Sequence, residues 1–249
     1  MNGERLIACE GLRVGYGRSA ILPPIDVSIG RGELWAVIGR NGSGKTTWLR
    51  TLLGLLQPVS GAVTRHRANL RLSYLPQRQT FDELHPLLVR DVVALGLERQ
   101  SSFLWPRPRS SREKVLRALE RVGAAELAAR PFRQLSDGQR QRVLFARIAA
   151  AEPDLAVLDE PTSAMDLVAE REAYELLRSL VDDTKLSLIV VSHFMGLARK
   201  FADRAMFLDR ETKTVVMGTP AEVLAHEAFR GRFADSLRPP PAEEVSSGP

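Results

Sequence analysis

A glycine-rich segment near the start of the chain restricts the possible folds more than any other feature. Its residues are Gly39, Arg40, Asn41, Gly42, Ser43, Gly44, Lys45 and Thr46. It follows a continuously apolar run at residues 34–38, typical of a strand buried on both faces, and precedes a helical pattern at residues 46–56. This spacing in this setting is that of a phosphate-binding loop. The segment therefore predicts an α/β domain that binds a nucleotide.

The loop also predicts the contacts that its residues make. Glycine lets successive backbone N–H groups turn inward around phosphate oxygens without obstruction by side chains. A helix that begins near Lys45 adds the positive end of its dipole. Lys45 is expected to reach the β- and γ-phosphates, and Thr46 to ligate Mg²⁺. We count Thr47 among the nucleotide-binding residues as well.

Two adjacent acids end a second buried run. Residues 155–158 are all apolar, and Asp159 and Glu160 follow them. In an open parallel sheet, ligands lie beyond the carboxyl ends of the strands, so both acids are expected beside the phosphates. Asp159 suits the Mg²⁺ shell, and Glu160 can polarise the attacking water. The alternative is a solvated strand end before the turn at Pro161, but the presence of the phosphate loop favours the catalytic interpretation.

The remaining pattern indicates one α/β domain, residues 1–235, with a parallel sheet core and a helical insertion. Further strands are predicted at residues 6–9, 25–29, 70–75, 186–191 and 205–208. Helices are predicted at residues 112–122, 139–151 and 168–181. The insertion spans about residues 86–151 and contains a loop at residues 105–111. Residues 236–249 offer no apolar run to pack and are expected to be disordered.

Composition argues against several other classes of protein. The single cysteine, Cys9, rules out an internal disulfide framework and a cysteine-rich metal site, and we expect it to pack within a strand. No apolar run approaches the roughly 20 residues that cross a bilayer, so a membrane role needs a partner chain. The basic residues, 30 Arg and 5 Lys, are scattered without a dense basic block. Binding of nucleic acid is therefore not expected.

A third segment points to a family. Ser136 is followed three residues later by Gln139, a capping box that explains the start of a helix. The whole stretch from Leu135 to Arg142 closely resembles the signature sequence of ATP-binding cassette (ABC) proteins, and the resemblance extends over nearly the whole chain. It implies a P-loop NTPase with a RecA-like parallel sheet core and an N-terminal antiparallel β part. The helical insertion is then the subdomain that carries the signature.

The resemblance implies roles for residues that lack a motif of their own. Gln77 looks like the glutamine of the Q-loop, which senses Mg²⁺ and contacts the transport domain. Residues 163–166 resemble the D-loop, which places Asp166 at the dimer interface. His193 resembles the switch histidine, and Tyr16 the aromatic residue that stacks on adenine. The assignments of His193 and Tyr16 depend on the resemblance alone.

The same resemblance implies a head-to-tail dimer that encloses two ATP molecules. Each nucleotide is expected between the phosphate loop of one copy and Ser136, Gly138 and Gln139 of the other, where a helix N-terminus supplies N–H groups to the γ-phosphate. ATP favours closure because it contacts both halves, and hydrolysis releases them. Asp137 departs from the family, which usually has a glycine there. An acid is favourable at a helix N-terminus, and we expect its side chain to point away from the phosphate.

Such a motor could serve several machines. An importer is expected because the chain has one nucleotide domain and no membrane span, and because residues 86–96 resemble the zinc/manganese and iron-chelate group. This implies a metal ion or metal chelate as cargo, permease subunits on separate chains and an extracytoplasmic substrate-binding protein. The chain is then peripheral, at the cytoplasmic face of the inner or plasma membrane. The alternatives are an exporter motor and a non-transport ATPase acting on DNA or ribosomes. DNA-repair members of the family place a long coiled coil between the phosphate loop and the signature. Here only about 90 residues without sustained heptads separate the two motifs.

Overall fold

A computed structural model describes residues 4–77, 87–97, 109–163, 165–192 and 195–233. Several predictions fall outside these ranges. They concern His193, part of the loop at residues 105–111, and the tail at residues 236–249.

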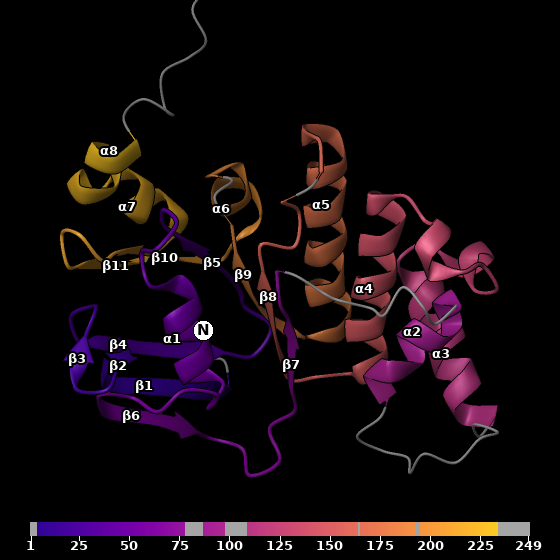
Figure 1. Cartoon of the computed structure of the whole chain (residues 1–249), viewed down its shortest axis with the longest axis horizontal. Helices are drawn as coiled ribbons and strands as arrows, with labels where there is room; N and C mark the ends of the chain where they lie inside the picture. Colours follow the sequence, from indigo (N-terminus) through magenta and orange to yellow (C-terminus); the bar gives the residue numbers. More distant parts are fainter. Residues whose placement is uncertain (1–3, 78–86, 98–108, 164, 193–194, 234–249) are drawn as a thin grey trace, which may run out of the picture.

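A mixed six-stranded sheet forms the centre of the described chain (Figure 1). Its strands, in spatial order, are β11 (Thr214–Gly218), β10 (Arg204–Asp209), β5 (Leu34–Ile38), β9 (Ser187–Val191), β8 (Leu155–Asp159) and β7 (Leu72–Leu75). β10, β5, β9, β8 and β7 run parallel, and β11 joins the edge antiparallel to β10. The parallel strands therefore end at one common edge, where a ligand is expected.

A second, antiparallel sheet lies at the N-terminal side of the molecule. β1 (Arg5–Arg13) is its central strand, between β4 (Ile25–Gly30) and β6 (Ser60–Arg65). The short strands β2 (Gly15–Tyr16) and β3 (Ser19–Ala20) form a hairpin between β1 and β4 in sequence. Figure 1 places this sheet on the side of the central sheet opposite to helices α2, α3 and α4.

Both faces of the central sheet are buried, because successive apolar side chains along its strands point alternately into two cores. On β5, Leu34, Ala36 and Ile38 face one core, whereas Trp35 and Val37 face the other. α1 (Lys45–Leu52) and the antiparallel sheet cover the face that includes Trp35. The opposite face packs against the helical insertion and against the helices α5 (Leu167–Thr184), α7 (Pro220–Ala225) and α8 (Glu227–Phe233). α6 (Met195–Phe201) follows β9.

The helical insertion packs around one long helix. α4 (Asp137–Ala151) lies against α2 (Val89–Ala94) and α3 (Arg109–Arg121). Short 3₁₀ turns connect these helices at Leu95–Leu97, Ala125–Leu127 and Phe132–Gln134. The buried side chains of the insertion join the core that contains Leu34, so the insertion and the sheet share one apolar interior.

The structure confirms the predicted α/β class, the parallel core and the antiparallel N-terminal part, but it corrects several boundaries. α1 ends at Leu52 rather than residue 56, and α3 already begins at Arg109 within the predicted loop. β6 and β11 were not predicted, because β6 is mostly exposed and neither strand has the continuously apolar run of β5. Cys9 lies buried in β1, as expected, and burial raises its pKa to about 12. No helix within the described ranges is long and apolar enough to cross a bilayer.

Candidate active site

The glycine-rich loop joins β5 to α1 and turns tightly. Gly42 and Gly44 have φ angles of 78° and 102°, in a region that glycine adopts without strain. At Gly39, an added Cβ would lie 2.5 Å from the backbone oxygen of Leu208 in β10, so a larger residue does not fit. α1 begins at Lys45, and its first N–H groups have no partner within the helix. The loop is thus a cradle whose polarity suits a phosphate.

Lys45 is held where the cradle meets the helix. Its side chain is buried, and Nζ donates to the carbonyl oxygens of Gly39, at 2.6 Å, and Arg40, at 3.0 Å. Burial lowers the pKa of Lys45, and the nearby charges of Glu160 and Asp159 oppose this shift. The lysine therefore lies between the loop and the acid pair, as a cation that neutralises phosphate must.

Asp159 is joined to the loop by a long-range contact. It is the last residue of β8, and its Oδ2 accepts hydrogen bonds from Thr46 Oγ1 at 3.3 Å and from the Tyr74 hydroxyl at 3.5 Å. Burial raises the pKa of Asp159, although these hydrogen bonds act in the opposite direction. The hydroxyl of Thr46 and the carboxylate of Asp159 are oxygen ligands of the kind that Mg²⁺ prefers.

Glu160 occupies a strained turn directly after β8. Its φ is 49°, and its N–H donates to the carbonyl oxygen of Val191 at 3.0 Å. A non-glycine residue in this conformation costs on the order of 1–3 kcal/mol and is concentrated at functional sites. Its carboxylate accepts a hydrogen bond from Gln77 Nε2. The turn thus directs the second acid toward the residue that follows β7.

One surface hollow of about 380 Å³ brings these groups together. Residues 41–47 form its base, and Gln77 and Glu160 line it as well. Asp159 is joined to this lining through its contact with Thr46. Tyr16 lines it as well; the side chain is exposed, and its hydroxyl lies 3.3 Å from Thr47 Oγ1. The exposed ring leaves a face open to a planar group. The predicted loop residues, the acids, Gln77 and Tyr16 therefore converge within one chain.

The signature segment lines a different hollow. Ser136, Gly138 and Gln139 border a space of about 590 Å³ between α4 and α5. The predicted capping box is present: Ser136 Oγ accepts from Gln139 N at 3.4 Å, and Ser136 N donates to Gln139 Oε1 at 3.2 Å. The Asp137 side chain is 68% exposed and pairs with Arg140 at 3.6 Å along its own helix. Within one chain, the structure does not bring the signature to the phosphate loop.

The predicted D-loop residue also has a local role. Asp166 is the N-cap of α5, and its Oδ1 accepts from Val168 N at 3.0 Å and Ala169 N at 2.8 Å. Such caps typically contribute about 1 kcal/mol to helix stability. The exposed side chain of Asp166 therefore stabilises the start of α5, and its place at a dimer interface stays a prediction.

Sequence reasoning missed two residues at the site. Tyr74 is bonded to Asp159, and Arg210, directly after β10, lines the same hollow as the loop. Tyr74 gave no signal, because a tyrosine in a strand is usually structural. Arg210 could have been found, since the rule that places Asp159 at a carboxyl end applies equally to the strand at 205–208.

The chain is similar to known ATP-binding proteins over most of its length. Residues 22–163 match the ABC transporter family. Zinc import ATP-binding protein ZnuC of Cereibacter sphaeroides is 39% identical over 228 residues, which cover 92% of this chain and 88% of the relative. The protein of the same name from Pseudomonas putida is 36% identical over 237 residues, 94% of this chain and 87% of the relative.

Solved structures have the same fold. An inward-facing conformation of a metal-chelate type ABC transporter superposes with a TM-score of 0.83 at 27% identity, over 93% of this chain and 90% of that one. The cbiO1 protein of Clostridium perfringens, part of the ABC transporter complex cbiONQ, has a TM-score of 0.78 at 25% identity, over 94% and 96%. With its phosphate loop, acid pair and signature helix in place, the chain belongs to the ABC transporter family and carries that family's ATP-binding domain.

Proposed function

We propose that this chain is the ATP-hydrolysing motor subunit of an ABC importer, and that the cargo is zinc or another metal ion or chelate. The observation that carries the proposal is that both acids meet the phosphate loop: Glu160 lines the hollow of the loop, and Asp159 contacts Thr46. Thr46 and Asp159, 113 positions apart in the chain, are in direct contact there. The importer function is supported by the zinc-import relatives, which match this chain over nearly all of its length.

The loop binds and orients the triphosphate. Backbone N–H groups of residues 39–46 and the α1 N-terminus contact phosphate oxygens, and Lys45 neutralises the β- and γ-phosphates. Thr46, Asp159 and Gln77 would hold Mg²⁺, which would neutralise negative charge on the β- and γ-phosphate oxygens. The described residues contain no group of three His, Cys, Asp or Glu side chains that could hold a metal ion by themselves. This suits Mg²⁺, which usually takes the rest of its ligands from phosphate and water.

Glu160 is the general base. It polarises the water that attacks the γ-phosphate, and its turn after β8 holds its carboxylate beside Gln77. By family resemblance, His193, which lies outside the described residues, is the switch histidine. Tyr16 stacks on adenine at the other end, since the residue is 60% exposed where it lines the hollow.

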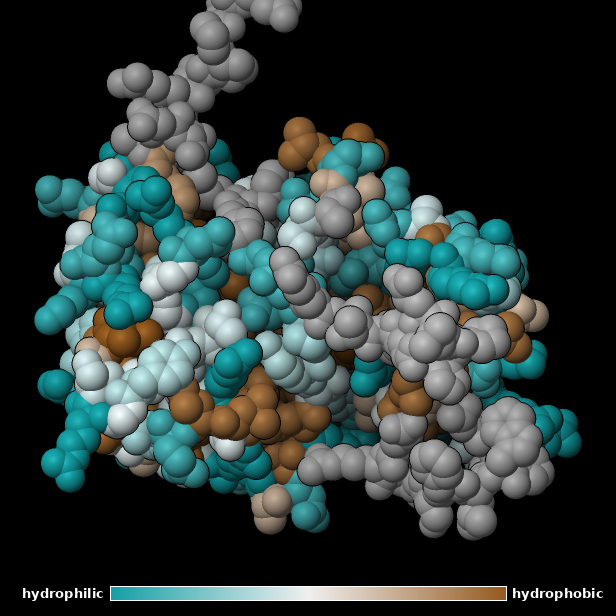
Figure 2. All heavy atoms as spheres, viewed as in Figure 1, coloured by the Kyte–Doolittle hydropathy of each residue, from teal (hydrophilic) through white to brown (hydrophobic). Residues whose placement is uncertain are grey.

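Hydrolysis takes place in a head-to-tail dimer of this chain. Ser136, Gly138 and Gln139 lie on another hollow than the loop, so they are not part of the nucleotide site of their own chain. In the head-to-tail arrangement that the family resemblance implies, they contact the nucleotide bound by the partner copy. The N-terminal end of α5, beside the signature hollow, offers a surface that could contact the partner copy. Leu167 and Val168 are 72% and 69% exposed directly after Asp166, and Figure 2 shows a hydrophobic area over this end of α5. A dimeric cassette is known for a bacterial homologue with a TM-score of 0.65 and 25% identity.

The motor acts through partner chains. Permease subunits on separate chains span the membrane, and this chain binds them from the cytoplasmic face. An extracytoplasmic protein delivers the cargo. The membership of cbiO1 in a multi-chain transporter complex supports this arrangement. An exporter or a non-transport role on DNA or ribosomes is less favoured, because the relatives named above are import proteins.

Two experiments test the proposal. The purified chain should hydrolyse ATP only with Mg²⁺, and Lys45→Ala should lose about 10²-fold or more in turnover. Lys213→Asn, which removes a lysine charge outside the hollow, should match wild type. Solubilised membranes should release the chain together with a multi-span protein, and its deletion should lower zinc uptake. Absence of ATPase activity in every preparation would refute the motor; co-purification with ribosomes or DNA would refute the transport role.

A further inference from the structure

Arg210 lies beside the phosphate loop because of how two strands pair. β10 runs parallel to β5, with Phe207 opposite Ile38. One residue later, the Leu208 carbonyl approaches Gly39 so closely that a Cβ would lie 2.5 Å from it. The chain that leaves β10 therefore passes next to the loop that leaves β5, and Arg210 lines the loop's hollow.

The residues on either side of Arg210 are fixed from the C-terminal helix. Arg232 of α8 donates to Asp209 at 2.5 Å and 3.3 Å, and it also pairs with Glu211. The Glu211 N–H donates to Asp209 Oδ1 at 2.9 Å, which closes the turn. α8 has a second, apolar anchor, since Phe229 is buried against Phe207 with ring centroids 5.4 Å apart.

These contacts involve Asp209 and Glu211 but not Arg210, which lies between them in the sequence. Asp209 and Glu211 both bind Arg232, whereas no ion pair or hydrogen bond of the Arg210 side chain is found among the described residues. Arg210 is exposed, so its guanidinium is free to meet a ligand in the hollow. A turn that holds both neighbours limits how far the arginine can move away.

The sheet order decides which part of a nucleotide Arg210 can meet. Glu160 follows β8 and Gln77 follows β7, both on one side of β5, whereas β10 lies on the other side. Arg210 therefore flanks the loop opposite to the acids that would hold Mg²⁺ and the γ-phosphate. A planar guanidinium with five N–H donors is well suited to phosphate oxygens.

We infer that Arg210 is a further nucleotide-binding residue, which contacts the α- or β-phosphate oxygens, and that Arg232 positions it. The inference rests on the proposed function, because it requires a nucleotide in this hollow. It adds a second cation to the site on the flank opposite the acids. It also makes the C-terminal helix α8 part of the support of the binding site.

The test compares nucleotide affinity in matched variants of the full chain. Arg210→Gln should weaken binding of ADP and ATP alike by roughly 10-fold, because both carry the α- and β-phosphates. Lys213→Asn removes the same charge from the same turn, outside the hollow, and asparagine tolerates its φ of 50°. This control should bind as wild type. Calorimetric titration with ADP and with ATP, with Mg²⁺ and at low protein concentration, gives both affinities.

Arg232→Met tests the positioning role. It removes the ion pairs but keeps the side-chain stem and the Phe229 packing, so the protein should stay folded. Binding of ADP should weaken several-fold, and steady-state ATPase should show a raised KM with a nearly unchanged kcat, since no reacting atom is touched. The double variant with Arg210→Gln should be no weaker than Arg210→Gln alone, because Arg232 acts through Arg210.

The outcomes separate this inference from the proposed function. If wild type binds nucleotide, Lys45→Ala does not, and Arg210→Gln equals Lys213→Asn, then Arg210 is no ligand and only this inference fails. A loss confined to ATP, with ADP unchanged, would also overturn it, because it would place Arg210 at the γ-phosphate. If wild type itself binds neither nucleotide, the proposed function is refuted, and the inference that rests on it is refuted as well.

Discussion

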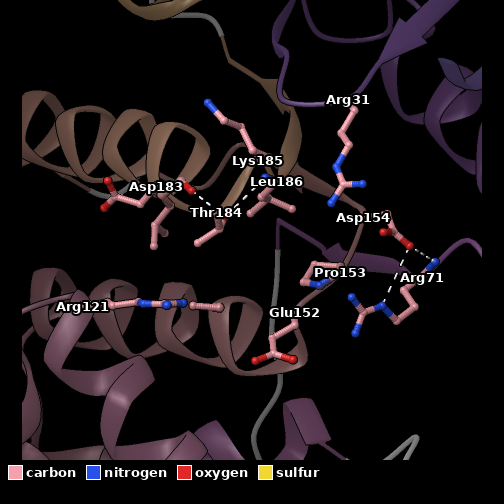
Figure 3. Close-up of a pocket in the computed structure, with 12 residues that line it drawn as sticks. Arg31, Arg71, Arg121, Glu152, Pro153, Asp154, Asp183, Thr184, Lys185 and Leu186 are labelled. Carbon is pink, nitrogen blue, oxygen red and sulfur yellow. Dashed lines mark hydrogen bonds and ion pairs between the residues drawn. The ribbon is translucent and has the colours of Figure 1, made fainter. Parts of the chain in front are cut away.

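The two ends of the parallel strands carry similar charged residues but differ in what those residues do. At the carboxyl ends, Lys45, Asp159 and Glu160 gather around a glycine cradle, and Lys45 and Glu160 line an open hollow. At the amino ends, a second hollow of about 270 Å³ is lined by arginines and acids that precede the strands (Figure 3). Its central acid is Asp154, which accepts from Arg71 N at 2.8 Å and pairs with Arg67 at 2.7 Å.

Helix direction explains the difference. α1 begins at the carboxyl end of the strands and presents N–H groups there. α4 and α5 end at the amino end, where Glu152 and Lys185 are their C-cap residues, and present carbonyl groups. Figure 3 shows Glu152 and Lys185 beside that hollow. A polyanion is favoured at helix N-termini and disfavoured at C-termini. Charged residues at the amino end therefore pair with one another, whereas at the carboxyl end the charged residues around the start of α1 are available to a ligand.

The largest contrast is expected between two acids in similar strained conformations. Glu160 and Glu152 have φ angles of 49° and 45°, at the carboxyl and amino ends respectively. Glu160→Gln should lower ATP turnover roughly 10²–10⁴-fold while ATP still binds, because only the base is lost. Glu152→Gln should leave turnover unchanged. Steady-state phosphate release measures both; near-normal turnover in Glu160→Gln would remove Glu160 from the base role.

Asp154 should affect stability rather than turnover. Asp154→Ala removes an acceptor whose side chain is only 9% exposed, and it leaves Arg67 without that ion pair. We expect the free energy of unfolding to fall by about 2 kcal/mol, as for hydrogen bonds to charged groups. Urea denaturation measures this. Asp183→Ala, an exposed acid of the same hollow, is the control and should change stability by less than about 0.5 kcal/mol. A loss of turnover per folded molecule in Asp154→Ala would contradict the division between the two ends.

Asp209 is a paired acid at the carboxyl end, and its stability effect should depend on pH. Burial opposes its ionisation, but hydrogen bonds from Arg232 and the Glu211 N–H together hold the pKa of Asp209 below its ordinary value. A lowered folded-state pKa gives stability above the unfolded pKa of about 3.9, which is lost as the pH falls through the folded value. Asp209→Asn should thus cost about 1 kcal/mol at pH 7 and progressively less below pH 4. If the variant's loss of unfolding free energy relative to wild type stays constant from pH 7 to pH 3, this charge pairing is excluded.

The smallest effect is expected from relieving strain at the amino end. Glu152 caps α4 in the left-handed conformation that glycine usually occupies. Glu152→Gly should raise the free energy of unfolding by about 0.5–1 kcal/mol, since the relief of strain exceeds the added chain entropy and the exposed pair with Lys114 contributes little. Thermal unfolding measures it. The same change at Glu160 should abolish turnover, whatever it does to stability.

The predictions from sequence succeeded where the residues that define a motif are contiguous in the chain. The phosphate loop, the capping box at Ser136 and the buried run before Asp159 each occupy fewer than about ten consecutive residues, so spacing alone predicts their local structure. Their elements are present in the structure. β6 and β11 were missed because their neighbours, not their own patterns, make them strands.

The sequence alone determined the nucleotide-binding loop, the strand that ends in two acids and the family. It also predicted that Asp159 and Glu160 lie beside that loop. Only the tertiary structure decided that Thr46 contacts Asp159 directly and that Gln77 reaches Glu160. It likewise decided that the signature lines another hollow than the loop of its own chain. It also decided that Arg210 joins the site while Asp154 stays in an internal pair. The physical reason is that strand order and helix direction determine which distant charges meet, and neither is encoded in local spacing.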